Sequence, residues 1–133
     1  MDAEVSLGRS VSVQVPRPVE EVFDHIVEPG LLSSYFTSET SGPLIVGAHV
    51  TWRWADGRSE TVDVEEVETN RRVVLRAGSS KVTIVLAALE PNRTKVTIEE
   101  EGELASAFEH GAGWERMLLG LKARMAFGID LRD

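Results

Sequence analysis

The side chains of this sequence that are best suited to bind a ligand are aromatic. Trp52 and Trp54 stand two positions apart in a segment that alternates between apolar and polar residues, so their rings share one face of a predicted strand. An indole ring supplies a large apolar area and one N–H donor that needs a hydrogen-bond partner when it is buried. The pair predicts the wall of an apolar pocket. The alternative is that both rings fill the core.

A helical pattern later in the chain adds three further candidates. Trp114 and Met117 stand three residues apart, and Phe108 belongs to the apolar stripe of the same predicted helix. These side chains either line the pocket beside Trp52 and Trp54 or pack as ordinary core residues. We therefore include all five among the candidate ligand-binding residues.

Two ionisable side chains are candidates for acid–base catalysis. His110 lies four residues before Trp114, so the two can touch, and a histidine there could bind a ligand or transfer a proton. The alternative is a residue on the helix flank that is hydrogen-bonded to backbone or water. Glu100 shares the inward parity of Ile98, and an inward carboxylate is a candidate general base. The alternative, which we prefer, is that the strand has ended and that residues 99–101 are all solvated.

The remaining ionisable side chains form no catalytic or metal-binding pattern. His25 lies beside an apolar stripe and His49 opens a strand, so both are expected to face solvent. Strand parity places Arg76 outward, and it could orient a ligand only if a bulge turned it inward. The sequence has no His-x-His or His-Glu-x-x-His spacing, no glycine-rich phosphate loop and no nucleophile elbow. We expect no metal and no cofactor.

Composition excludes several classes of function. The chain has 133 residues, no cysteine and a formal net charge of −8. The absence of cysteine excludes a disulfide scaffold and thiolate metal sites. An acidic surface disfavours nucleic acid and anionic membranes as partners. No apolar run reaches the roughly 18 residues of a membrane span, and the sequence begins without a signal-peptide pattern. We expect a single cytoplasmic domain over residues 1–133.

The first part of the sequence predicts a strand followed by two short helices. Residues 11–15 alternate valine with polar residues, which is typical of a half-buried strand. An i, i+3, i+4, i+7 apolar stripe predicts a helix over residues 19–26. Pro29 and the glycine after it should end that helix, and residues 31–36 predict a second one.

The middle of the sequence predicts an antiparallel meander. Asp56-Gly57 is a strong hairpin-turn signal. Val62 and Val64 share a face that Val67 does not, which predicts a bulge near residues 65–66. Further short runs of strand-forming residues follow at 73–75, 82–88 and 96–98. Strands joined by such short turns pair antiparallel.

From about Glu103 to Phe127 the apolar period changes to 3.6, which predicts one long amphipathic helix. Gly111 and Gly113 inside it mark a kink or a close backbone approach. Helix and sheet must bury their apolar faces together, and the sheet should curl around the helix. The predicted fold is α+β: a curved antiparallel sheet of about six strands wrapped around a long C-terminal helix. Two short helices follow the first strand, and a cavity lies between sheet and helix.

This arrangement resembles the helix-grip fold of the START and birch-pollen-allergen (SRPBCC) superfamily. The resemblance covers residues 5–128, and the segments that carry it are 15–23, 31–36, 46–48, 94–98 and 110–122. In the segment 31–36 the family usually has tryptophan where this chain has Tyr35. The resemblance places Tyr35 and Phe36 at the mouth of the cavity, where they either gate it or pack as core residues. Both join the candidate ligand-binding set.

Within that superfamily the sequence most resembles the family named for activator of heat-shock protein 90 ATPase, homologue-1-like. The resemblance implies a stand-alone member of a mostly bacterial group, and it implies no chaperone activity. Three hypotheses follow. The first, which we prefer to an enzymatic one, is a module that binds an apolar or amphipathic small molecule. The second is a polyketide cyclase-like enzyme that uses the same cavity, and the third is a protein-interaction module. We expect a monomer or a homodimer.

Overall fold

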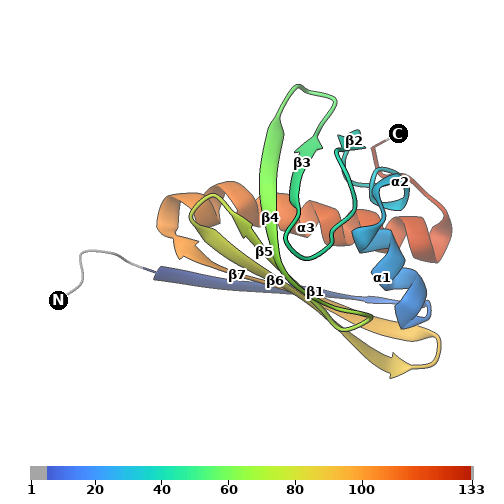
Figure 1. Ribbon diagram of the computed structural model, residues 1–133. Helices are drawn as coiled ribbons and strands as arrows, with labels where there is room; N and C mark the ends of the chain where they lie inside the picture. Colours follow the sequence, from blue (N-terminus) through green and yellow to red (C-terminus); the bar gives the residue numbers. More distant parts are fainter. Residues whose placement is uncertain (1–5, 133) are drawn as a thin grey trace.

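A curved antiparallel sheet of seven strands wraps around a long C-terminal helix (Figure 1). The computed structural model describes residues 6–132, and it describes side chains for residues 10–102 and 113–132. The strands are β1 (Ser6–Val15), β2 (Glu39–Thr40), β3 (His49–Arg53), β4 (Ser59–Glu68), β5 (Arg72–Ala77), β6 (Ser80–Glu90) and β7 (Arg93–Glu103). Their order is β1-β7-β6-β5-β4-β3-β2, so each strand from β2 to β6 pairs with its successor, and β1 pairs with β7.

Three helices accompany the sheet: α1 (Val19–Val27) and α2 (Pro29–Leu32) follow β1, and α3 (Leu104–Phe127) follows β7. The first helix ends before Pro29, as predicted, but Pro29 itself begins α2. Proline suits a first helical position because its φ is fixed and an N–H there has no helical partner. The second helix therefore starts earlier than the predicted range 31–36, and residues 33–36 form turns instead.

The predicted fold class is confirmed, with one strand added. The added strand, β2, has two residues and pairs with β3, and so short a strand leaves no alternation to read. The predicted bulge is confirmed by a register shift between Val64 and Glu66 in the pairing of β4 with β5. Gly57 has a φ of +92°, which glycine adopts without strain, in the predicted hairpin turn.

The core lies between the concave face of the sheet and the helices. Along β6, for example, Val82, Ile84 and Leu86 are buried while the residues between them are not, as alternation requires. From α3, Met117 and Leu121 enter the same core. The helix packs chiefly along β1 and β7. The sheet and helix therefore bury their apolar faces against each other as predicted.

Strand β7 runs to Glu103, beyond the point at which we preferred to end it. Glu99 and Glu101 are exposed, whereas Glu100 is buried on the inner face. The interpretation that all three are solvated is therefore wrong for Glu100. The physical reason is the pairing with β1, which continues through Arg9 opposite Glu100 and so maintains the strand's alternation.

Candidate ligand-binding site

Four aromatic rings from three separate segments meet on the inner face of the sheet. They are Trp52 in β3, Trp54 directly after β3, Phe36 in the turn after α2 and Trp114 in α3. The ring centroid of Trp52 lies 5.6 Å from that of Phe36 and 6.2 Å from that of Trp114. Trp54 lies 6.5 Å from Trp52 and 5.4 Å from Phe36. All four contacts are edge-to-face, a favoured geometry for aromatic pairs. We call these four residues the aromatic cluster.

Burial within the aromatic cluster decreases from its centre to its rim. Trp52 is 1% exposed and Trp114 6% exposed, whereas Phe36 and Trp54 are only partly buried. The guanidinium carbon of Arg58, from the β3–β4 turn, lies 5.6 Å from the centroid of the Trp54 ring in a cation–π contact. The cluster therefore has a dry centre and a rim that solvent reaches.

The indole N–H of Trp52 is buried, and no atom in the described part of the chain accepts a hydrogen bond from it. Its neighbours in the aromatic cluster present ring edges and faces. A ring face accepts an N–H only weakly. A buried donor left without a partner costs about 1–3 kcal/mol of stability. Trp52 therefore holds a polar group that a ligand could satisfy.

Tyr35 is placed differently from Phe36, its neighbour in sequence. Its hydroxyl donates a 2.9 Å hydrogen bond to the backbone carbonyl of His25 in α1. Burial raises the pKa of Tyr35 far above its usual value, so the hydroxyl keeps its proton. Gly120 of α3 comes so close that a Cβ there would lie 3.2 Å from the Tyr35 carbonyl oxygen, whereas the Cβ position of Gly113 meets open space. These contacts favour packing, rather than gating, as the role of Tyr35.

Two further predicted site residues lie inside the core. Met117 is buried with the aromatic cluster in the same apolar core. Glu100 places a buried carboxylate on the inner face of β7, as a cyclase-like enzyme would require. Phe108 and His110 lie on α3 in the stretch whose side chains fall outside the described residues, so their roles stay predictions.

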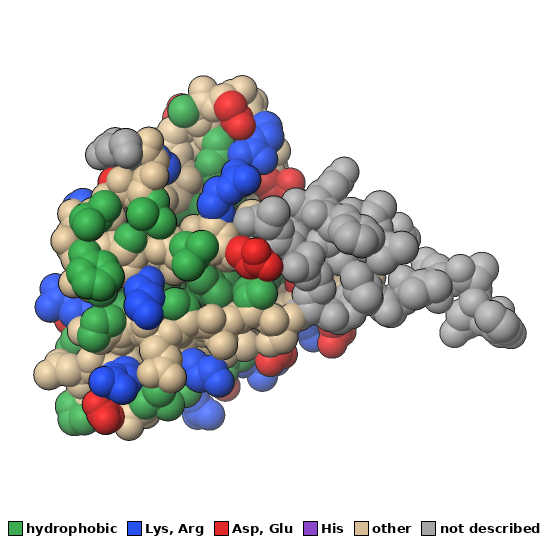
Figure 2. All heavy atoms as spheres, turned by 180° about the vertical axis from the view of Figure 1, so that it is seen from behind, with side chains coloured by type: hydrophobic (Ala, Val, Ile, Leu, Met, Phe, Trp, Pro, Cys, Tyr) green, Lys and Arg blue, Asp and Glu red, His purple; other side chains and the backbone are tan. Residues whose placement is uncertain are grey.

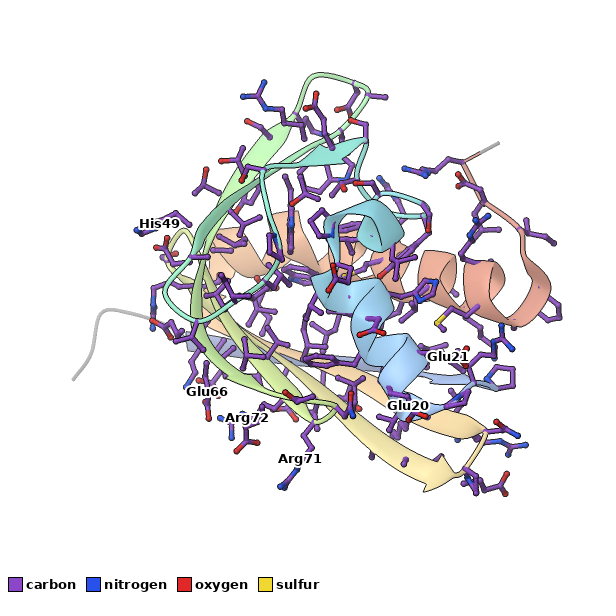
Figure 3. The ribbon with its side chains drawn as sticks, turned by 45° about the vertical axis from the view of Figure 1, so that its right-hand side comes forward. Glu20, Glu21, His49, Glu66, Arg71 and Arg72 are labelled. Carbon is purple, nitrogen blue, oxygen red and sulfur yellow. The ribbon has the colours of Figure 1, made fainter. Side chains whose placement is uncertain are left out.

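The other ionisable candidates lie outside this interior. The Arg76 side chain is on the outer face, as its parity predicts, and its Nε donates to Glu65 Oε2 at 3.1 Å. His49 is exposed and pairs with Asp63 across β3 and β4, on the side of the sheet away from the helices (Figure 3). His25 donates from Nδ1 to a backbone carbonyl one turn earlier in α1. Among the described residues, no group of three or more His, Asp and Glu side chains could hold a metal ion.

The outer face of the sheet carries a charged hollow of about 500 Å³ over β4 to β7. Three Lys or Arg side chains and three Glu side chains line it together with smaller residues. Figure 3 shows Glu66, Arg71 and Arg72 pointing away from the helices on this side. Arg72 Nη2 lies 3.5 Å from Glu66 Oε2. Because charges of both signs alternate here, we assign the hollow no ligand.

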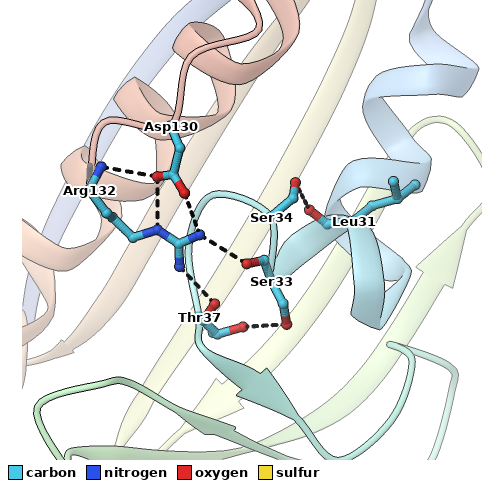
Figure 4. A network of polar contacts seen from close by, with 6 residues as sticks. All are labelled: Leu31, Ser33, Ser34, Thr37, Asp130 and Arg132. Carbon is cyan, nitrogen blue, oxygen red and sulfur yellow. Dashed lines mark hydrogen bonds and ion pairs between the residues drawn. The ribbon is translucent and has the colours of Figure 1, made fainter.

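The residues after α3 form a polar network that the sequence did not reveal (Figure 4). Arg132 donates from Nη1 to the Thr37 carbonyl at 2.9 Å and from Nη2 to the Ser33 carbonyl at 3.0 Å. Its Nε and Nη2 also donate to the two carboxylate oxygens of Asp130. We call these four residues the C-terminal network. It holds both ends of the segment that carries Phe36 to the aromatic cluster. An Asp-x-Arg sequence carries no signal that identifies such remote partners.

The face of the molecule seen from behind mixes hydrophobic with Lys and Arg side chains (Figure 2). Among the described side chains of α3 and the segment after it, the large apolar ones that remain exposed are Leu119, Phe127, Ile129 and Leu131. Exposed apolar residues of this kind are compatible with a protein contact. Within residues 6–132, no helix combines the length and the apolarity that crossing a membrane requires.

Comparison with known proteins identifies a family and several solved structures that share this fold. A family model described as Activator of Hsp90 ATPase homolog 1-like protein matches residues 16–126. Among curated proteins, none matches this sequence. The solved structure of SSP2350 from Staphylococcus saprophyticus is 25% identical, with a TM-score of 0.84 over 95% of this chain and 96% of that one.

Two further solved structures share the fold at lower identity. The Aha1 dimer from Colwellia psychrerythraea is 19% identical, with a TM-score of 0.80 over 92% of this chain and 98% of that one. DynU16, a protein in the dynemicin biosynthetic locus, is 24% identical, with a TM-score of 0.80 over 91% of this chain. The match covers only 48% of DynU16, so this chain spans about half the length of that protein.

Proposed function

Because this chain belongs to the Activator of Hsp90 ATPase homolog 1-like family, we propose that it is a small-molecule binding module of the cytoplasm. The ligand is apolar or amphipathic and binds between the sheet and α3, at the aromatic cluster. The observation that carries the proposal is the arrangement of that cluster, with a buried centre at Trp52 and a partly exposed rim at Phe36 and Trp54. We propose residues 1–133 as one binding domain.

The rim distinguishes this arrangement from a closed core. Here Phe36 and Trp54 retain accessible surface although both contact the buried Trp52. An apolar ligand that covers the two rim rings gains about 25 cal/mol for each Å² removed from water, less the cost of association. The aromatic cluster therefore provides both contact area and a place of entry.

Two structural relatives support parts of this proposal. DynU16 is a protein in the dynemicin biosynthetic locus, and such a locus is a setting for small-molecule ligands. The Colwellia relative is a dimer, and this favours a homodimer over a monomer for the present chain. The exposed apolar side chains at Phe127, Ile129 and Leu131 would suit either a second copy or another protein.

The test is a binding screen that uses the three tryptophans as reporters. Fatty acids, steroids and polycyclic aromatics are titrated into the protein while tryptophan fluorescence and Tm are followed. A ligand should raise Tm with concentration, as linkage requires. Phe36→Ala and Trp54→Ala should weaken binding, and Leu119→Ala should leave it unchanged because Leu119 is exposed on α3 away from the cluster. A panel in which no compound raises Tm or changes fluorescence contradicts the proposal.

The burial of Glu100 favours a cyclase-like enzyme as the second candidate function. Its carboxylate lies on the same inner face of the sheet as the core, where an acid–base group could meet a bound ligand. Glu100→Gln keeps the shape and removes the charge, and the exposed Glu99→Gln is the matched control. Cyclisation of a poly-β-ketone substrate that falls in the first variant alone would support the enzyme. Equal turnover in both variants would exclude Glu100 as its acid–base group.

A further inference from the structure

The buried indole N–H of Trp52 indicates which chemical group a ligand of this site should carry. This side chain is 1% exposed, and its donor is unsatisfied within the described part of the chain. The contrast with Tyr35 is direct, because the hydroxyl of that equally buried ring has the His25 carbonyl as its acceptor. Buried polar groups in folded proteins are nearly always hydrogen-bonded, so an exception calls for an explanation.

The surroundings of the indole explain why the chain itself offers no acceptor. Trp52 is contacted edge-to-face by Phe36, Trp54 and Trp114, which come from three different segments. Rings of this kind offer the N–H only their faces, which are weak acceptors. A ligand that enters among these rings and carries an acceptor would complete the hydrogen bonding of the site.

The acceptor should be uncharged. Arg58 is a cation next to the cluster, and its Nε is already 2.7 Å from Asp56 Oδ2. The chain carries a net charge of −8. Burying a ligand carboxylate at Trp52 would cost far more desolvation than one neutral N–H donor returns, whereas a carbonyl oxygen carries no charge.

We propose that the site takes a neutral ring compound that carries a carbonyl group, and that the carbonyl oxygen accepts the hydrogen bond from Trp52 Nε1–H. This inference rests on the proposed function, because it requires a ligand in the aromatic cluster. Entry is from the rim, where the rings of Phe36 and Trp54 are only partly buried. The backbone around Phe36 stays in place, since Arg132 holds the carbonyls of Ser33 and Thr37.

The experiment compares two probes of nearly equal shape, 2-acetylnaphthalene and 2-isopropylnaphthalene, which differ in the carbonyl oxygen. Their dissociation constants are measured for the wild-type protein and for Trp52→Phe, which removes the N–H and keeps an aromatic ring. Comparing the two proteins cancels the different solubilities of the probes. We expect the ketone-to-hydrocarbon preference to fall about fivefold in Trp52→Phe, the effect of one neutral hydrogen bond. Trp54→Phe is the control and should change both affinities alike.

A second measurement does not depend on the variant. In wild-type protein with ¹⁵N-labelled indole groups, the Nε1–H resonance of Trp52 should move downfield with the ketone and not with the hydrocarbon. If the preference is the same in both proteins, or if the resonance responds equally to the two probes, the carbonyl inference is overturned while the binding function stands. If neither probe binds, the proposed site for apolar ring compounds fails and the inference fails with it.

Discussion

The aromatic cluster and the C-terminal network both involve the segment from Ser33 to Thr37, yet the hydrogen bonding of their polar groups is opposite. In the C-terminal network, Arg132 donates to two backbone carbonyls and to a carboxylate. In the aromatic cluster, the buried N–H of Trp52 has no acceptor in the described part of the chain. One side of the segment is therefore polar and satisfied, and the other is apolar with one donor left over.

The difference separates polar groups that hold the fold from one that is available to a ligand. The chain brings Arg132 to the Ser33 carbonyl across 99 positions of sequence, so it can supply distant hydrogen bonds where they stabilise the fold. Around Trp52 the chain places aromatic rings instead of a hydrogen-bond acceptor. We infer that the C-terminal network fixes the frame of the site and that the aromatic cluster is the part that responds to a ligand.

The largest expected effect tests whether Trp52 holds the core through its ring or through its N–H. Trp52→Ala should lower the free energy of unfolding by about 3–5 kcal/mol, because it leaves a cavity among three other rings. Trp52→Phe should cost less than about 1.5 kcal/mol, because the loss of ring area is offset by removal of an unsatisfied donor. Urea unfolding of both variants measures the difference. A cost for Trp52→Phe close to that of Trp52→Ala would mean that the N–H has a structural partner.

A smaller effect is expected from the C-terminal network. Arg132→Ala should lower the free energy of unfolding by about 1–3 kcal/mol, because the buried Thr37 and its neighbour Ser33 each lose a charge-assisted hydrogen bond. Arg132→Lys should not restore it, since an ammonium group lacks the planar fork. Arg93→Ala is the matched control: its ion pair with Glu90 is exposed, so its loss should change the free energy of unfolding far less. If both alanine substitutions lower the free energy of unfolding equally, the C-terminal network contributes no more stability than an exposed ion pair.

The two regions also differ in how far the sequence predicts them. Trp52 and Trp54 could be assigned to one face of a strand because period-two alternation is a local pattern. Their contact with Phe36 was not derivable from the residues, because it depends on where the turn after α2 lies against β3. The fold class followed from alternation, turn signals and the helical period, and only the two-residue β2 lacked a pattern.

The errors have a common physical cause. Three successive glutamates are typical of a solvated strand end and so predict Glu100 in solvent, yet pairing with β1 carries the strand past them. Gly111 and Gly113 predict a kink or a close approach; Gly111 lies outside the described side-chain positions and Gly113 meets open space. The close approach of α3 falls at Gly120, because it is set by the position of Tyr35, more than 80 residues away. Arg132 acts on Ser33 and Thr37 over a similar distance in sequence. In each case a tertiary contact decided what the local pattern left open.

The smallest effect is a pH dependence at Asp130. Hydrogen bonds from the side chain and backbone of Arg132 lower the pKa of Asp130 from 3.8 to about 2. Because the pKa is lower in the folded state than in the unfolded chain, this carboxylate stabilises the fold above about pH 4, and its contribution is lost as pH falls from about 4 to about 2. The difference in urea midpoint between wild type and Asp130→Asn should therefore be constant above pH 5 and disappear near pH 2. The aromatic cluster contains no ionisable side chain, so the effect of Trp52→Phe should stay constant over the same range. A difference at Asp130 that persists at pH 2 would place the stabilisation in the shape of the side chain instead of its charge.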